Sequence, residues 1–135
     1  MKSYSIEPIG IAHTPYKERG QAPRQSIYGK EGQGEIEIFN SFIEGIQGLE
    51  KYEYIIVLFY FDRISGYSLK ATPPGEVISR GVFATRSPAR PNHIGLSVLK
   101  LIKAEGNIIK FSGVDMLDGT PIIDIKPYVR ELESK

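Results

Sequence analysis

The stretch Tyr52-Glu53-Tyr54-Ile55-Ile56-Val57-Leu58-Phe59-Tyr60-Phe61 decides the fold of this 135-residue chain. Aromatic and β-branched residues fill it, and no charged residue interrupts it after Glu53. The apolar run is far shorter than the roughly 20 residues that a membrane-spanning helix needs. A short apolar run without polar alternation is typical of a central β-strand that is covered on both faces. We therefore expect this strand to be the centre of a β-rich core.

Further strands are expected on both sides of this central strand. Alternating apolar residues predict strands over residues 4–11, 35–39, 81–85, 97–104, 108–112 and 121–125. The turn Glu105-Gly106-Asn107 joins two of them into a hairpin. A short helix is expected after residue 40, where Ser41-Phe42-Ile43-Glu44 fits a capping box and Gly48 is a stop signal. Because strands recur with few helices between them, we predict a mostly β fold: a single-domain antiparallel β-barrel over residues 1–135, with one short helix and long irregular loops.

Composition excludes several classes of protein. The sequence contains no cysteine, which rules out disulfide frameworks, thiolate nucleophiles and zinc held by cysteine. Only two histidines are present, His13 and His93, so no metal site is expected. The N-terminus lacks the apolar segment of a signal peptide and no membrane anchor is visible, so a cytoplasmic location without a membrane partner is expected.

Charge is distributed unevenly, although 17 Lys and Arg against 16 Asp and Glu give a net charge of only +1. No acidic residue lies between Glu76 and Glu105, and that interval holds five basic residues: Arg80, Arg86, Arg90, Lys100 and Lys103. A second basic stretch holds Lys17, Arg19, Arg24 and Lys30. If the fold brings the two stretches together, one face could bind phosphates or a carboxylate. The alternative is a solvated surface with acidic residues across the strand.

An arginine-containing loop is the first candidate for chemistry. It reads Thr85-Arg86-Ser87-Pro88-Ala89-Arg90-Pro91-Asn92-His93-Ile94-Gly95-Leu96-Ser97 and lies between two expected strands. Its prolines fix φ, and its arginines offer planar guanidinium groups for a carboxylate, a phosphate or an adenine face. A stiff loop loses less entropy on binding than a flexible one. The alternative is a rigid turn whose arginines pair with nearby acidic residues.

The second candidate is the stretch from Asp115 to Tyr128. Asp118-Gly119-Thr120 is common turn chemistry and is weak evidence by itself. Asp124 stands inside an apolar strand and needs a partner, and Lys126 lies two residues further along the same strand face. The carboxylate could act as a general base, or the two residues could form a structural ion pair. The long irregular segment over residues 15–34 is either functional or disordered.

Two motifs carry a resemblance to a known family. They are Gly81-Val82-Phe83-Ala84-Thr85-Arg86-Ser87-Pro88-Ala89-Arg90-Pro91-Asn92, and Leu117-Asp118-Gly119-Thr120-Pro121 with Asp124-Ile125-Lys126-Pro127-Tyr128. With them, the chain resembles the TsaA-like family of β-barrel, S-adenosylmethionine-dependent tRNA methyltransferases, from Ile9 to Tyr128. The resemblance implies methyl transfer to N6 of the threonylcarbamoyl-modified adenosine next to the anticodon of a threonine tRNA. It also implies a homodimer with the cofactor near the subunit interface.

The resemblance assigns roles to individual residues. The implied contacts with S-adenosylmethionine are Pro23, Arg24, Gln25, Asp62, Arg63, Arg86, Leu96, Leu117, Asp118, Gly119 and Thr120. In this set Arg24 and Arg86 suit the methionine carboxylate or tRNA phosphates, and Leu96 suits an adenine face. Asp62 or Asp118 would favour the sulfonium charge. Arg90, Asn92 and His93 are expected on the substrate side. Our hypothesis for the catalytic base is Asp124, with Lys126 and Tyr128 as supporting groups.

The sequence also departs from the family pattern. His93 replaces the second proline of the usual Arg-Pro-Asn-Pro, and Asp62 stands where a histidine is common. Longer members continue past the position of Lys135 into an extension, so the barrel or a dimer partner is expected to grip the tRNA. The alternatives are a barrel that binds S-adenosylmethionine for sensing or sequestration, a methyltransferase for a small-molecule acceptor, and a nucleic-acid-binding barrel without catalysis.

Overall fold

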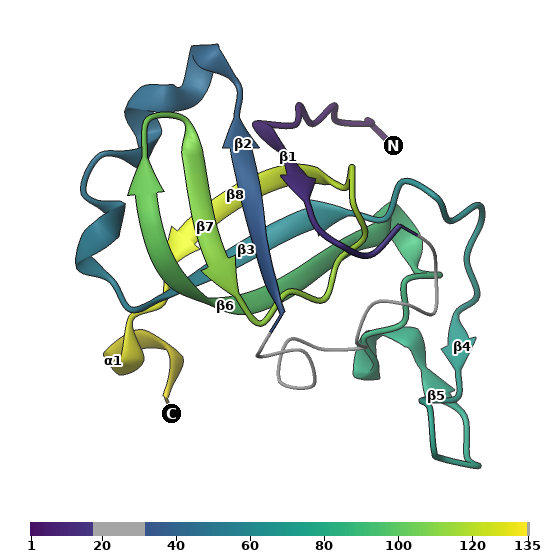
Figure 1. Cartoon of the computed structure of the whole chain (residues 1–135). Coiled ribbons are helices and arrows are strands. Elements are labelled where there is room, and N and C mark those ends of the chain that lie inside the picture. The colour runs from purple at the N-terminus through teal and green to yellow at the C-terminus, as the bar shows by residue number, and fades with distance from the viewer. Residues whose placement is uncertain (18–31, 135) are drawn as a thin grey trace.

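The computed structural model describes residues 1–17 and 32–134, and its centre is a closed antiparallel barrel (Figure 1). The strands follow one another around the barrel in the order β1-β2-β7-β6-β3-β8. Their bounds are Gly10–His13 for β1, Gln33–Ile38 for β2, Tyr54–Tyr60 for β3, Ile94–Glu105 for β6, Ile108–Ser112 for β7 and Pro121–Pro127 for β8. The predicted mostly β class and antiparallel barrel are confirmed.

The core fills the inside of this barrel. In β3, Ile55, Val57 and Phe59 point inward and are buried. The other inward apolar residues are Ala12, Ile36, Ile38, Leu99, Ile109, Phe111, Val114, Met116 and Ile122. The outward residues of β3 are only partly buried, and Tyr54 is 38% exposed. The prediction that this strand is covered on both faces was therefore wrong for a single copy of the chain, because the barrel encloses only one of its faces.

The central strand pairs with β6 on one side and β8 on the other. Phe59, near its end, lies opposite Gly95 of β6. A Cβ atom at Gly95 would stand 2.6 Å from Cζ of Phe59 and 2.8 Å from Cζ of Phe61, so both rings would have to move. These rings pack edge to face with their centroids 5.1 Å apart. The glycine thus allows an aromatic pair to close one end of the barrel.

Helical segments are short. The expected helix after residue 40 is a 3-10 helix, η2 (Asn40–Ile46), and it is followed by η3 (Leu49–Lys51). The predicted capping box does not form: η2 is capped by Phe39 without a side-chain hydrogen bond. Gly48 has a φ of 89° and separates the two segments, as a stop signal should. The one α-helix of the described residues, α1 (Arg130–Glu133), was not expected.

Two predicted strands have different bounds in the structure. The first begins at Gly10 instead of residue 4. The strand expected over residues 81–85 was wrong: β5 (Arg80–Gly81) ends there and the 3-10 helix η4 (Val82–Ala84) follows. The chain turns because Thr85 donates hydrogen bonds to the carbonyl of Val82 from its amide at 3.0 Å and its hydroxyl at 2.8 Å. The hairpin of β6 and β7 is confirmed, with Gly106 at a φ of 63° in its turn.

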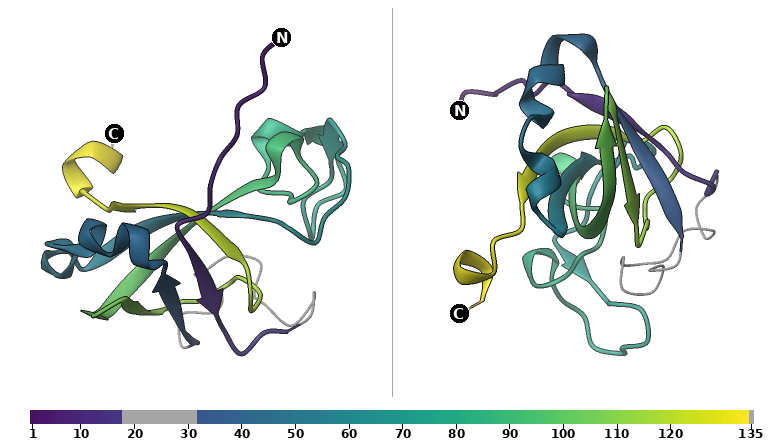
Figure 2. Two further views of the ribbon diagram at one scale, coloured as in Figure 1. Left: turned by 90° about the horizontal axis from the view of Figure 1, so that it is seen from above. Right: turned by 60° about the vertical axis from the view of Figure 1, so that its left-hand side comes forward.

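A long segment projects from the barrel between β3 and β6. It contains the two-stranded sheet of β4 (Lys70–Ala71) and β5, and both views in Figure 2 show it standing apart from the barrel. The segment ends in the 3-10 helix η5 (Pro91–His93), from which β6 starts. No helix in the described part of the chain is long and apolar enough to cross a membrane.

Candidate functional site

A cavity of about 980 Å³ lies where the projecting segment meets one end of the barrel. Phe59, Phe61 and Gly95 contribute apolar surface from the ends of β3 and β6. The projecting segment contributes Asp62, Arg63, Ile64, Thr72, Pro73, Pro74, Glu76, Arg80, Ala84, Thr85, Arg86, Ser87, Pro88 and Arg90. Residues 115–117 and Thr120 close the remaining side. The cavity therefore combines apolar walls with charged groups from loops, as small-molecule sites do.

Many of the residues expected to bind ligand meet in this cavity. Those that line it are Asp62, Arg63, Arg86, Arg90, Leu96, Leu117 and Thr120. They come from three segments that lie far apart in the sequence. Pro23, Arg24 and Gln25 fall outside the described residues. The fold thus gathers the arginine loop, the segment after β3 and the late turn around one space.

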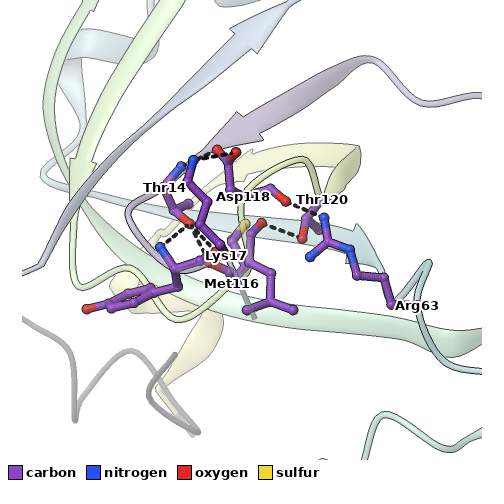
Figure 3. Close-up of polar contacts among 8 residues, drawn as sticks. Thr14, Lys17, Arg63, Met116, Asp118 and Thr120 are labelled. Carbon is purple, nitrogen blue, oxygen red and sulfur yellow. Dashed lines mark hydrogen bonds and ion pairs between the residues drawn. The ribbon is translucent and has the colours of Figure 1, made fainter. Parts of the chain in front are cut away.

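The turn of residues 117–120 is anchored to β1, to the residues that follow β1, and to Arg63 (Figure 3). The carboxylate of Asp118 accepts hydrogen bonds from the Thr14 amide at 2.9 Å and from Nζ of Lys17 at 2.8 Å. These two bonds hold the pKa of Asp118 below its ordinary value. The Arg63 guanidinium donates to the main-chain carbonyl of Asp118, and Oγ1 of Thr120 donates to the carbonyl of Leu117 at 2.7 Å. Asp118 therefore fixes the turn.

Asp118 and Gly119 are not part of the cavity lining. The Asp118 side chain lines a smaller hollow beside β1, together with His13 and Thr14. Gly119 has a φ of 84°, the left-handed conformation that favours glycine. These two residues hold the shape of the turn, while Leu117 and Thr120 face the cavity.

Internal hydrogen bonds stiffen the arginine loop. Nη1 of Arg90 donates to the main-chain carbonyls of Thr85 at 2.8 Å and Ser87 at 3.2 Å. Arg90 thus binds loop carbonyls, whereas the alternative interpretation expected acidic partners. Nε2 of His93 lies 2.6 Å from the carbonyl oxygen of Gly66, and its ring stands edge to face with Tyr60. Asn92 and His93 are not among the lining residues.

His93 and its neighbour also have unusual backbone conformations. The φ angles of Asn92 and His93 are 68° and 51°. Proline, whose φ is fixed near about −65°, cannot adopt this conformation. His93, which stands where the family motif has proline, therefore permits this left-handed backbone conformation. Its imidazole adds a contact to the carbonyl of Gly66.

Of the three residues proposed for catalysis, Asp124 and Lys126 lie along the outer side of β8, and Tyr128 follows the end of that strand. Asp124 is in register with Leu58, and Lys126 with Ile56, whose side chains point away from the core. Nζ of Lys126 is 2.8 Å from Oδ2 of Asp124, so the expected pairing is confirmed, and the carboxylate raises the pKa of Lys126.

Tyr128 lies further along, at the other end of β3 from the cavity. Its amide donates to the carbonyl of Tyr54 at 3.0 Å, and the two rings pack edge to face. The cavity lining formed by the described residues does not include Asp124, Lys126 or Tyr128.

The sequence analysis included Ser97 and Asp115 in its two candidate stretches but gave neither a role and did not predict their contact. Asp115 lines the cavity, and its Oδ1 accepts a hydrogen bond of 2.6 Å from Oγ of Ser97. Ser97 is a buried polar residue at an inward position of β6. The available signal was a serine in the alternation Gly95, Ser97, Leu99, because a buried hydroxyl needs a partner.

The fold and the cavity define a closed antiparallel β-barrel with a cavity at one end, which loops and guanidinium groups line. The chain matches the family described as "tRNA-methyltransferase O N-terminal domain" over residues 11–134 and belongs to it. The resemblance seen in the sequence is thereby confirmed.

Individual relatives agree with this family. The chain is 45% identical over 93% of its length to a probable S-adenosyl-L-methionine-binding protein of Pyrococcus abyssi, of which the match covers 68%. It is 37% identical over 99% of its length to the tRNA (adenine(37)-N6)-methyltransferase of Escherichia coli, of which the match covers 61%.

Solved structures share the fold. A crystal structure of TrmO superposes with a TM-score of 0.83 at 37% identity, covering 99% of this chain and 61% of that one. The structure of TrmO from Pseudomonas aeruginosa gives a TM-score of 0.82 at 35% identity, covering 99% and 60%. The chain thus spans about three fifths of the TrmO structures that it matches.

Proposed function

We propose that this chain transfers a methyl group from S-adenosylmethionine to N6 of an adenine in tRNA. The observation that carries the proposal is the meeting of Arg63, Arg86, Leu96, Leu117 and Thr120, from separate segments, around one cavity. Membership of the tRNA-methyltransferase O family adds to it. The acceptor we propose is the threonylcarbamoyl-modified adenosine next to the anticodon of a threonine tRNA, and the reaction would take place in the cytoplasm.

The chemistry of the cavity fits S-adenosylmethionine. Arg86 offers a guanidinium for the amino-acid carboxylate. Leu96, which is 38% exposed, offers an apolar surface for the adenine ring. Asp62 places negative charge in the lining, which favours a sulfonium. When bound, S-adenosylmethionine supplies an electrophilic methyl carbon.

The chain's own contribution is mainly positioning. The fixed turn of residues 117–120 and the stiff arginine loop can hold two reactants in line, and good alignment lowers a bimolecular barrier by several kcal/mol, about 7 or more. Arg90, Asn92 and His93 would face the tRNA. Asp124, supported by Lys126 and Tyr128, is our sequence-based candidate for the base. Since Asp124 and Lys126 lie on the outer side of β8, they could act only on an acceptor that reaches this surface.

The outer faces of β3 and β6 are unusually apolar for a barrel exterior. Leu58 and Leu96 pair across them in register, as do Ile56 and Val98. This surface adjoins the cavity, because Ile94 and Leu96 belong to both. We propose that a second copy of the chain covers it, with the site near the interface.

The test is a single-turnover reaction with labelled S-adenosylmethionine. Total tRNA carrying the threonylcarbamoyl group is compared with tRNA lacking it, and the labelled nucleoside is identified. We expect label only on the modified adenosine. Binding of S-adenosylmethionine without label in any RNA would instead favour a binding or sensing barrel. That alternative is motivated by the near-neutral net charge and by relatives named only as S-adenosyl-L-methionine-binding proteins.

A further inference from the structure

Two aromatic residues of the projecting segment are exposed to solvent next to residues that line the cavity. Tyr67 is 60% exposed and Phe83 is 77% exposed. Neither is among the described residues that line the cavity or pack in the core. Phe83 directly precedes Ala84, which belongs to the lining. Exposed aromatic surface beside a cavity is typical of a recognition site, because such rings have a cost in water and no role in the core.

The backbone of Tyr67 is held against the arginine loop on both sides of the residue. Before it, the carbonyl oxygen of Gly66 lies 2.6 Å from Nε2 of His93. After it, the amide of Ser68 donates to the carbonyl of Ala89 at 3.2 Å. The position of Tyr67 is therefore fixed while its ring remains in solvent, and a ring on a fixed backbone loses little entropy when it binds a partner.

The backbone of Phe83 is fixed as well. Its neighbour Val82 is buried, and the Val82 amide donates to the carbonyl of Leu69 at 2.9 Å. On the other side, the amide and the hydroxyl of Thr85 donate to the Val82 carbonyl. The bond between Val82 and Leu69 also brings the stretch that contains Tyr67 beside the stretch that contains Phe83. Two exposed rings are thus presented from one braced part of the projecting segment.

The positive charge of the chain is concentrated in this same segment. Residues 61–93 hold two acidic residues, Asp62 and Glu76, against five basic residues: Arg63, Lys70, Arg80, Arg86 and Arg90. The rest of the chain then holds 12 of the 17 basic residues and 14 of the 16 acidic ones. A segment with net positive charge on a chain that is otherwise slightly negative favours a polyanionic partner. Basic groups combined with exposed aromatic rings are the usual means of binding unpaired nucleotides.

We propose that the projecting segment binds the anticodon loop of the tRNA, with the rings of Tyr67 and Phe83 stacked on unpaired bases that flank the methylated adenosine. This inference rests on the proposed function. An enzyme that modifies a base takes it out of the stack and into a pocket, so the neighbouring nucleotides stay outside the cavity. The two rings stand where those nucleotides would lie. Lys70 is exposed, two residues before the lining residue Thr72, and contacts the loop phosphates.

The experiment compares the dissociation constants of two labelled RNAs, an anticodon stem-loop of a threonine tRNA and a blunt duplex of equal length. Phe83→Ala and Tyr67→Ala should each weaken binding of the stem-loop about tenfold, the scale for losing one stacked base, and change binding of the duplex by less than about twofold. The affinity for S-adenosylmethionine should stay within about twofold of wild type. Tyr4→Ala removes a ring that is 87% exposed before β1, and this matched control should bind the stem-loop like wild type.

Two further variants separate stacking from other kinds of contact. Phe83→Tyr keeps an aromatic face and should retain the wild-type affinity for the stem-loop, whereas Phe83→Leu keeps apolar surface only and should behave like Phe83→Ala. Lys70→Ala should reduce the slope of log affinity against log salt by about one, and Lys51→Ala, in η3, should leave it unchanged. Wild-type affinity in Phe83→Leu would overturn stacking at this position.

The remaining outcomes distinguish this inference from the proposed function. Wild-type affinity for the stem-loop in both Phe83→Ala and Tyr67→Ala overturns the inference, and tRNA methylation by the wild type would then still support the proposed function. A wild type that binds the stem-loop through these rings but methylates no tRNA removes the proposed function alone. A wild type that does not bind the stem-loop overturns the inference. Leu69, Val77 and Ile78 of the same segment are also exposed, so sedimentation velocity is measured too. A changed oligomeric state of Phe83→Ala with unchanged RNA affinity would assign the rings to a second copy of the chain.

Discussion

The guanidinium of Arg63 donates a hydrogen bond to the main-chain carbonyl of Asp118. This contact joins the segment after β3 to the turn before β8, across 55 residues of sequence. The contact therefore ties together two segments that both contribute to the cavity lining, through Arg63 and through Leu117 and Thr120.

Arg63→Ala should weaken S-adenosylmethionine binding about tenfold, the equivalent of one hydrogen bond. The side chain is 38% exposed, so the free energy of unfolding should change by less than about 1 kcal/mol. Calorimetric titration measures the first quantity and urea unfolding the second. Arg130→Ala, an exposed arginine of α1, is the matched control and should behave as wild type. Equal affinities in the Arg63 variant and wild type would contradict the prediction.

Arg86→Ala should weaken S-adenosylmethionine binding more strongly, by about tenfold to a hundredfold, because it removes a charge-assisted hydrogen bond to a carboxylate. The same titration measures the effect. Lys103→Ala removes a positive charge from the hairpin of β6 and β7, where Lys103 pairs with Glu105, and should leave the affinity unchanged. Unchanged affinity in the Arg86 variant would remove Arg86 from the binding site.

Gly95→Ala should destabilise the fold by about 1–3 kcal/mol, because the new methyl group overlaps the rings of Phe59 and Phe61. Urea unfolding measures the change. Gly45→Ala is a suitable control, since a Cβ atom there meets nothing within 4 Å, and its effect should stay within about 0.5 kcal/mol. Comparable stability for the two variants would mean that the aromatic pair tolerates displacement.

Acid should destabilise the protein partly through Asp118. Its pKa is lowered in the folded state by Lys17 and the Thr14 amide, so the unfolded chain binds its proton more readily. The stabilisation is present above the ordinary carboxyl pKa of 3.8 and is lost as the pH falls through the folded-state value. The urea midpoint should therefore decrease below about pH 4, and less steeply in Asp118→Asn. Parallel pH curves for the two proteins would contradict this origin.

Ile56→Lys should dissociate the proposed homodimer. The substitution puts a charge in the apolar outer face of β3, in register with Lys126. Sedimentation velocity should show a dimer for the wild type and a monomer for the variant. Leu132→Lys makes a similar change at an exposed position of α1 and should remain dimeric. A monomeric wild type would exclude the second copy as the cover of this face.

Local patterns explain why much of the barrel could be predicted. The central strand and the hairpin around Gly106 followed from apolar periodicity and turn chemistry, which depend on neighbouring residues. The prediction of a strand over residues 81–85 was wrong, because local hydrogen bonds overrode the propensity of the residues there. Val82 and Phe83 have high β-propensity, but two hydrogen bonds from Thr85 turn the chain there.

Contacts within the candidate site could not all be predicted from the spacing of residues along the sequence. Asp124 and Lys126 lie two residues apart, so their pairing could be predicted from strand geometry. Ser97 and Asp115 meet across 18 residues, and their contact depends on how the segment after β7 crosses the end of the barrel. The family resemblance pointed to most of the expected cofactor contacts that line the cavity. A contact of Asp118 with the cofactor stays a prediction, and its carboxylate binds Thr14 and Lys17.

The barrel is closed by its first and last strands. Gly10 of β1 lies opposite Ile122 of β8, so the wall is complete only when the two ends of the chain meet. A domain with such high contact order folds slowly, since a long loop must close before its contacts are gained. During synthesis on a ribosome, the early strands would wait for β8 to emerge. The turn of residues 117–120 emerges just before it, so the cavity should acquire its shape in the same late event that completes the barrel.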